Sequence, residues 1–359
     1  MPKLTLDSAA EHFVQSTVLR QNDAEWRLHR RFVHIVLSQA AVKQYHPVQE
    51  DLARRLCFSL LTHPENFNAD LRLFSGRVVI AVTYGLSVDT ADSKYIKHAD
   101  ATMDLKEVVV GKQMIEDLIT APFEHVERDM RDGSAVPSLT QELLSMEKDD
   151  ISDFEQSVKW ATGSMYGAGA ESARLFDLSV GRTYATLLVF VLAMALHPKV
   201  QLQAQKEIDE VIGSQRLPGI ADKAQLPFVN AVIKETIRWR PIVPLTLGRR
   251  TSQDDIYRGL FIPKGAMVVP NVWAVAFAAN ERYDPQQFLP ERFLDPTEDV
   301  VDPSSWAFGF GKRMCPGKAL GENSVFIAIT SILWAFTISP PKHGSLNPKF
   351  THKLIRCVP

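Results

Sequence analysis

The residues best suited to chemistry lie together in one ten-residue stretch, Phe308 to Gly317, which reads Phe-Gly-Phe-Gly-Lys-Arg-Met-Cys-Pro-Gly. Its three glycines let the backbone approach a large, flat partner without a Cβ clash. Pro316 suits the first turn of a helix, where its missing N–H costs nothing. Cys315 is therefore expected at a helix N-terminus, where free N–H groups and the helix dipole favour a thiolate. A thiolate of this kind is a candidate ligand for iron.

Three further patterns carry possible chemistry. Glu235 and Arg238 are three residues apart, which puts them on one face of a helix and lets them pair. Ala168 to Ser172 places a glycine shortly before an acid and a hydroxyl. Trp26 and Arg30 are four apart and share a helix face. Each pattern alone is weak, because such residues are usually solvated or part of a core.

The ten-residue stretch is similar, at every fixed position, to the cysteine loop of the cytochrome P450 family, Phe-x-x-Gly-x-Arg-x-Cys-x-Gly. The resemblance implies that heme b binds here with Cys315 as the axial thiolate ligand of the iron, and that Arg313 reaches a heme propionate. The loop residues that it assigns to cofactor binding are Phe308, Arg313, Cys315 and Gly317.

The other patterns follow in the order that this family shows. Glu235-x-x-Arg238 resembles the family's Glu-x-x-Arg helix, and Arg292 in Pro290-Glu-Arg-Phe293 would complete a structural triad with that pair, because a buried charge is tolerated only when it is fully paired. Ala168 to Ser172 resembles the oxygen-activation motif, in which the glycine leaves room for dioxygen. The resemblance gives the catalytic roles to Glu171 and Ser172 and further cofactor-binding roles to Trp26, Arg30 and Arg250.

The composition and the apolar pattern fit such a protein. The chain has 359 residues, 45% of them hydrophobic, and a net charge of −2, which gives no indication of nucleic-acid binding. Three cysteines are too few for a disulfide framework and indicate a reducing setting. Apolar steps of three and four predict helices from Phe154, from Val200 to Gly213, before Pro241 and after Cys315. Short strands are expected between Pro241 and Pro303, so the predicted fold is mainly α with small β elements.

Three departures from the family pattern are expected to matter. The resemblance begins near Trp26, which predicts a single domain over 1–359 that is incomplete at the N-terminus and at the extreme C-terminus. Ten residues, Ala173 to Arg182, interrupt the long helix after Ser172. Either these residues should bulge out from the helix as a loop, or the helix should end near Ser172. The longest apolar run, Leu187 to Leu196, is too short to cross a bilayer.

The resemblance is strongest to eukaryotic microsomal members, especially fungal ones. It implies a monooxygenase that inserts one oxygen atom from O2 into an apolar substrate of secondary metabolism, terpenoid or polyketide. An NADPH-dependent reductase would supply electrons, and a missing N-terminal anchor would attach the full-length protein to the cytosolic face of the endoplasmic reticulum membrane. Three alternatives remain open: an inactive pseudoenzyme, a heme-thiolate isomerase or dehydratase, and a helical interaction protein.

Overall fold

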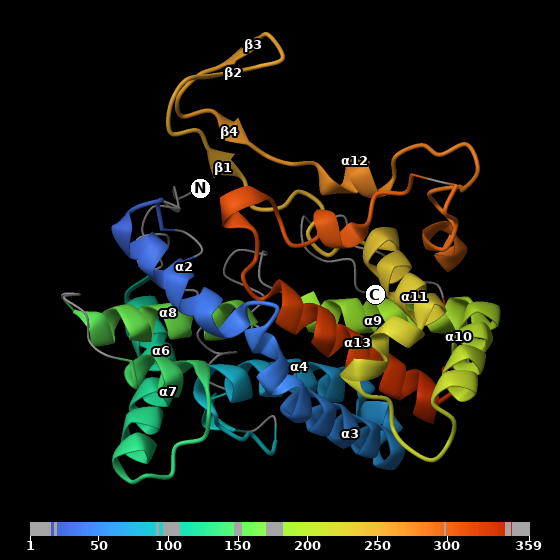
Figure 1. The fold of residues 1–359 in the computed structure, drawn as a ribbon, viewed down its shortest axis with the longest axis horizontal. Coiled ribbons are helices and arrows are strands. Elements are labelled where there is room, and N and C mark those ends of the chain that lie inside the picture. Colours follow the sequence, from blue (N-terminus) through green and yellow to red (C-terminus); the bar gives the residue numbers. More distant parts are fainter. Residues whose placement is uncertain are drawn as a thin grey trace.

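The computed structural model describes residues 16–17, 20–90, 93–95, 108–146, 153–169, 182–297, 299–341 and 346, with no side chains described for 108–114 and 182. Helices dominate this part of the chain, as the sequence predicts (Figure 1). The α-helices are α2 (Ala24–Leu37), α3 (His46–Thr62), α4 (Phe67–Tyr84), α6 (Val108–Arg131), α7 (Leu139–Leu144), α8 (Phe154–Gly169), α9 (Arg182–Leu196), α10 (Pro198–Val211), α11 (Pro227–Trp239), α12 (Val272–Ala276) and α13 (Lys318–Ala335).

Short 3-10 helices connect several of these elements. They are η1 (Ala41–Tyr45), η2 (Pro64–Asn66), η3 (Ile220–Gln225), η4 (Pro290–Phe293), η5 (Pro303–Ser305) and η6 (Gly311–Arg313). Three of them begin with or just after a proline, which fixes the first φ angle and needs no hydrogen bond there. The last, η6, lies inside the cysteine loop.

The core is built around α13, which packs against α3, α9 and α10. Leu320 and the run from Ser324 to Leu333 are buried, so this helix is covered on almost its whole circumference rather than on one stripe. The polar members of that run bond inward: Thr330 Oγ1 donates to the Phe326 carbonyl at 2.7 Å, and Ser324 Oγ to the Leu320 carbonyl at 2.8 Å. Hydroxyls satisfied in this way can be buried at little cost.

The helix boundaries follow local signals in the sequence. α10 begins at Pro198 and its end is followed by Gly213 at φ +72°, a left-handed conformation that favours glycine. α11 ends at Trp239, two residues before Pro241, because the ring of a proline disfavours a helix ahead of it. These boundaries confirm the predicted helices in both regions.

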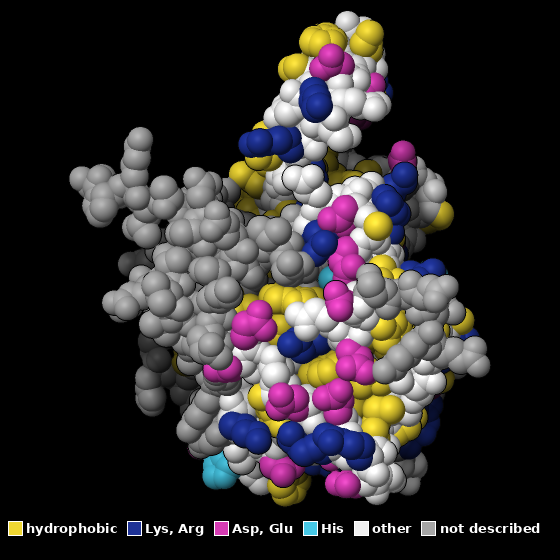
Figure 2. All heavy atoms as spheres, turned by 90° about the vertical axis from the view of Figure 1, so that its left-hand side faces the viewer, with side chains coloured by type: hydrophobic (Ala, Val, Ile, Leu, Met, Phe, Trp, Pro, Cys, Tyr) yellow, Lys and Arg dark blue, Asp and Glu magenta, His cyan; other side chains and the backbone are white. Residues whose placement is uncertain are grey.

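Two small antiparallel sheets lie between α11 and α12. β1 (Arg249–Arg250) pairs with β4 (Met267–Val268), and β2 (Asp255–Tyr257) pairs with β3 (Leu260–Ile262). The β2–β3 hairpin projects from the helical body (Figures 1 and 2). Its apolar side chains are mostly in solvent, with Ile256 70% and Leu260 69% exposed. The sequence predicts short strands here, but it contains no sign that they stand away from the core.

α9 is the most apolar helix after the interruption, and it turns into α10 at His197. The His197 ring stacks on Phe288, with centroids 5.1 Å apart, and so fixes this corner. No single helix among the described ranges is both long and apolar enough to cross a membrane; one pair, Thr183–Leu196 with Pro198–Val211, meets the criterion only when taken together and is bent by 108°.

Candidate active site

The cysteine loop is closed by its own backbone. The N–H of Cys315 donates to the Phe308 carbonyl at 2.8 Å, and the N–H of Met314 donates to the Gly311 carbonyl at 3.0 Å. Gly309 and Gly311 have φ values of +79° and +55°, in the left-handed region that glycine adopts without strain. The loop conformation therefore needs glycine at both positions.

The sulfur of Cys315 lies at the start of α13. The helix begins at Lys318, three residues after the cysteine, and Gly317 is its N-cap. A Cβ added to Gly317 would lie 3.9 Å from Cys315 Sγ, so the sulfur is next to the N-terminal end of the helix. The partial positive charge of a helix N-terminus stabilises an anion such as a thiolate. The side chain is partly exposed and forms no disulfide with Cys57, the other cysteine that the structure describes.

Trp26, Arg30 and Arg313 come together beside the cysteine loop, as the sequence predicts. The Arg313 guanidinium lies over the Trp26 ring, 4.1 Å from its centroid, and that of Arg30 lies 5.9 Å from the same centroid. Arg30 Nη1 donates to the Met314 carbonyl at 2.8 Å, which ties α2 directly to the residue before Cys315. Burial lowers the pKa of Arg30.

Arg313 has the electrostatic surroundings of an anion-binding residue. Its Nη1 is buried and has no hydrogen-bond partner among the described residues. Burial lowers the pKa of Arg313, and the nearby charges of Arg249 and Arg30 lower it further, whereas Asp23 raises it. An anion bound near Arg313 would be stabilised by its guanidinium and by the positive charges of Arg30 and Arg249. The carboxylates of a heme propionate pair fit this place.

The structure brings Arg249, rather than the predicted Arg250, to this cluster. Successive residues of a strand point to opposite faces, and here Arg249 is half-buried whereas Arg250 is exposed. Burial lowers the pKa of Arg249, and its charge acts on Arg313. Two adjacent arginines on a two-residue strand give no sequence signal for which of them faces inward, and the cofactor-binding role of Arg250 stays a prediction.

Glu235, Arg238 and Arg292 form the triad that the sequence predicts. All three are buried, with Glu235 0%, Arg292 3% and Arg238 4% exposed. Arg238 binds the carboxylate with both Nε, at 2.7 Å, and Nη2, at 2.8 Å, and Arg292 Nε lies 3.1 Å from Glu235 Oε2. The backbone N–H of Leu289 adds a bond of 2.7 Å to Glu235 Oε1. The buried charge is thus fully paired.

The triad also holds the chain that leads to the cysteine loop. Arg238 Nη1 donates to the carbonyls of Ala276 and Pro285, both at 2.9 Å, so α11 fixes the segment after α12. One turn earlier on α11, Lys234 pairs with Asp302 at 2.8 Å. Asp302 caps η5 through the Ser304 N–H at 2.8 Å. The position of Phe308 and the loop after it therefore depends on α11.

The predicted oxygen-activation residues, Glu171 and Ser172, lie outside the described residues, as do Ala173 to Gly181 of the interruption. The described part of the motif is the end of α8. A Cβ on Gly169 would lie 2.5 Å from Val79 Cγ2, so this glycine permits close packing of α8 on α4. Packing is therefore one reason for a glycine here, besides the predicted space for dioxygen.

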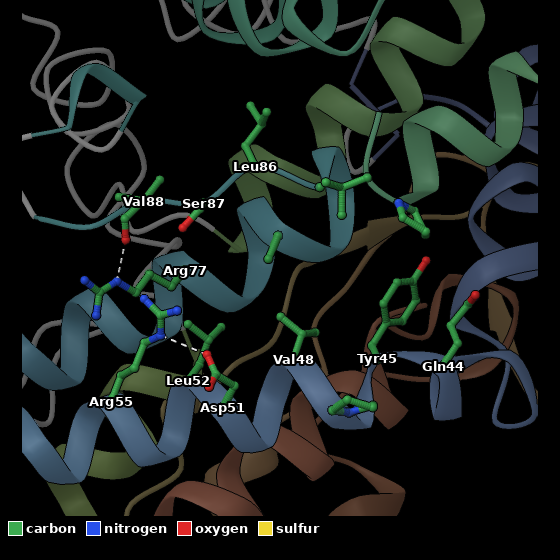
Figure 3. Close-up of a pocket in the computed structure, with 15 residues that line it drawn as sticks. Gln44, Tyr45, Val48, Asp51, Leu52, Arg55, Arg77, Leu86, Ser87 and Val88 are labelled. Carbon is green, nitrogen blue, oxygen red and sulfur yellow. Dashed lines mark hydrogen bonds and ion pairs between the residues drawn. The ribbon is translucent and has the colours of Figure 1, made fainter. Parts of the chain in front are cut away.

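A separate pocket of about 300 Å³ lies between α3 and α4 (Figure 3). Arg55 bonds Asp51 at 2.8 Å and Arg77 Nε donates to the Val88 carbonyl at 2.6 Å at one end, and Tyr45 lines the other. None of the residues that line this pocket belongs to the cysteine loop or to the arginine cluster. It is therefore a hollow apart from the candidate active site.

Sequence reasoning did not single out two residues near the site. One is Arg249. The other is His29 on α2, next in sequence to Arg30, which is buried between Glu25 and Thr17. The spacing of four residues from Glu25 to His29 was a usable sequence signal, because such a pair shares a helix face.

Comparison with known proteins gives the family. The family model for cytochrome P450 matches residues 102–358. The cytochrome P450 monooxygenase claR of Ampulloclitocybe clavipes is 33% identical, over 94% of this chain and 67% of the relative. The cytochrome P450 monooxygenase COX1 of Coprinopsis cinerea is 30% identical, over 91% of this chain and 69% of the relative.

Solved structures agree with the sequence matches. A zebrafish cytochrome P450 whose structure holds abiraterone superposes with a TM-score of 0.79 and 25% identity, covering 98% of this chain and 84% of that one. The chain spans about two thirds of the length of the curated relatives. With a family match over most of the chain, relatives above 30% identity and the same fold, the chain belongs to the cytochrome P450 family of monooxygenases.

Proposed function

We propose that Cys315 binds the iron of heme b as its axial thiolate and that the protein inserts one oxygen atom from O2 into an apolar organic substrate. When bound, a heme with a thiolate ligand supplies oxygen activation, because the thiolate donates electron density that favours cleavage of the O–O bond. The observation that carries this proposal is the buried Nη1 of Arg313, two residues before Cys315, which has no hydrogen-bond partner among the residues that the structure describes.

The arginine cluster supports the orientation of the cofactor. Arg30, Arg249 and Arg313 would hold the two propionates, with Trp26 stacked against Arg313 at 4.1 Å to fix its plane. Planar guanidinium groups suit carboxylates because they donate two parallel N–H bonds. Phe308 and Gly317 would flank the iron ligand, since the loop between them carries it and a Cβ at Gly317 would lie 3.9 Å from the sulfur.

Glu171 and Ser172 would supply protons to the reacting oxygen. Their place in the sequence follows α8 directly, and an acid beside a hydroxyl can pass protons one at a time. The substrate would be apolar, because half-buried residues between Val243 and Leu247 are largely apolar. The relatives are fungal cytochrome P450 monooxygenases. From the resemblance of the sequence to fungal microsomal members, we propose a role in terpenoid or polyketide metabolism on the cytosolic face of the endoplasmic reticulum.

Substitution of Arg313 tests the cofactor site. We expect Arg313→Gln to weaken heme binding by about 10- to 100-fold, because a charge-assisted hydrogen bond is worth about 1.5–3 kcal/mol. Lys312→Gln is the matched control, since it removes one positive charge from the next residue, which is exposed. Heme affinity is measured by titrating the apoprotein and following the visible absorption. Equal affinities of the two variants would contradict the placement of the propionates.

An NADPH-dependent reductase is the proposed electron donor, and it would dock on the side of the cysteine loop. Lys312 is exposed there. Lys318 already has partners within the protein, because its Nζ donates to the Ser304 carbonyl at 2.8 Å and lies 3.9 Å from Glu322. Of these two lysines, Lys312 would therefore contribute most of the electrostatic attraction for the reductase.

We expect Lys312→Glu to slow reduction several-fold at low ionic strength and to have little effect near 1 M salt, where the Debye length is about 3 Å. Lys206→Glu on α10, also an exposed lysine, is the control. Stopped-flow reduction by a microsomal reductase at several salt concentrations measures the difference. A rate that is the same for both variants at low salt would rule out this docking surface.

A further inference from the structure

A buried histidine connects the candidate active site to α8. The His29 side chain is completely inaccessible, with its Nδ1 2.9 Å from Thr17 Oγ1 and its Nε2 3.0 Å from Glu25 Oε1. It lies on α2, next in sequence to Arg30. None of the roles proposed above uses this ring.

The hydrogen bonds continue from His29 to α8 on both sides. Ser157 Oγ donates to Glu25 Oε1 at 2.6 Å, and the backbone N–H of Thr17 donates to Ser164 Oγ at 3.1 Å. Ser157 and Ser164 are both on α8, two helical turns apart. The histidine is thus the middle of a polar bridge between the two helices.

The bridge is satisfied when His29 is uncharged. Nε2–H then donates to Glu25, which also accepts from Ser157, and Nδ1 accepts the hydroxyl proton of Thr17. Burial lowers the pKa of His29 and outweighs Glu25, which raises it. The other charges near the ring are Arg20, which lowers the pKa, and Asp23, which raises it; the α8 side chains bonded to the bridge are hydroxyls.

The geometry of α2 relates this bridge to the cofactor site. Glu25 and His29 are four residues apart, as are Trp26 and Arg30, and a shift of one residue turns a helix by about 100°. One pair therefore faces α8 while the next faces the cysteine loop, where Arg30 bonds the Met314 carbonyl at 2.8 Å. Because the helix is rigid, a change on the first face moves the second.

We propose that His29 is a positioning residue: as an uncharged bridge to α8, it sets where α2 lies and so holds Trp26 and Arg30 at the propionate end of the heme. This inference rests on the proposed heme site. It assigns to His29 no contact with the cofactor.

Three variants test it in the heme-loaded protein. His29→Leu removes both bonds and leaves Glu25 and Thr17 short of a partner, whereas His29→Gln keeps an N–H that reaches toward Glu25. Val33→Ala, one turn further along α2 and 3% exposed, is the control for a loss of packing alone. The readout is the rate at which heme transfers to a scavenging apoprotein, together with the stability of each variant to urea.

We expect His29→Leu to lose heme about tenfold faster than the wild type, because buried polar groups without partners displace the helix. His29→Gln should stay within about twofold of the wild type, and Val33→Ala should lower stability without a matching change in heme loss. The inference is overturned if His29→Leu and Val33→Ala, at comparable losses of stability, release heme at the same rate.

A pH profile separates positioning from simple packing. Because the pKa of His29 is lowered in the folded protein, its contribution to stability is complete above the ordinary value of 6.5 and is lost as the pH falls below it. Heme loss from the wild type should accelerate below pH 6.5 more steeply than from His29→Gln. Identical profiles would overturn the inference, whereas a wild type that binds no heme at any pH would instead refute the proposed function.

Discussion

Replacement of Cys315 by alanine is expected to abolish the thiolate-type absorption of the bound heme and all turnover. The cysteine lies at the N-terminal end of α13, in a loop closed by its own N–H at 2.8 Å from the Phe308 carbonyl. Because the arginine cluster is intact in this variant, heme should still bind, but without the thiolate.

Cys57→Ala is the matched control. Cys57 is a buried cysteine on α3, and burial raises its pKa to about 12, so it stays a thiol at neutral pH and is a poor metal ligand. This variant should keep the absorption of the wild type. Optical spectra of the two purified variants decide the matter, and a thiolate-type spectrum that survives in Cys315→Ala would refute the ligand assignment.

Replacement of Arg238 by alanine should reduce heme content nearly as severely as loss of Cys315 reduces turnover, because it destabilises the fold rather than removing the iron ligand. It leaves the Glu235 carboxylate, which is 0% exposed, with Arg292 as its cationic partner in the described part of the chain. Breaking a buried pair in this way costs about 3–5 kcal/mol. It also frees the carbonyls of Ala276 and Pro285 that the guanidinium holds at 2.9 Å. We therefore expect a lower melting temperature and little retained heme.

Two further variants calibrate this result. Arg238→Lys keeps the charge but not the two-pronged geometry, and we expect a loss between those of the wild type and of Arg238→Ala. Lys206→Ala breaks an exposed pair with Glu210, 3.7 Å long, and should change the unfolding free energy by less than about 1 kcal/mol. Urea unfolding and heme content measure all three. Normal heme content and stability in Arg238→Ala would show that the triad is dispensable.

The parts of the site that were predictable from sequence are those with fixed local spacing. Cys315 and the three glycines of its loop lie within ten residues, and Glu235 and Arg238 are three apart on one helix. Each pattern can therefore be recognised without knowing the fold. Arg249 could not be chosen over Arg250, because the phase of a two-residue strand is set by its pairing with Val268 and Met267. Such pairing is a long-range feature that adjacent residues do not encode.

The fold shows the same division. The boundaries of α10 and α11 follow from Pro198, Gly213 and Pro241, whose backbone preferences act locally. The position of α13 at the centre of the helical body cannot be derived from such local preferences, because its burial on nearly all sides depends on the helices around it. The projection of the β2–β3 hairpin is likewise a tertiary feature (Figure 1).

The most direct test of the heme-thiolate assignment is the carbon monoxide difference spectrum of the reduced protein, produced with an ample heme supply. A thiolate ligand donates electron density to the iron and gives the CO complex a band that no neutral ligand produces. We predict that band for the wild type, in proportion to its heme content. A protein that binds heme but gives only the band of a neutral ligand, or that binds no heme at all, would contradict the account of Cys315.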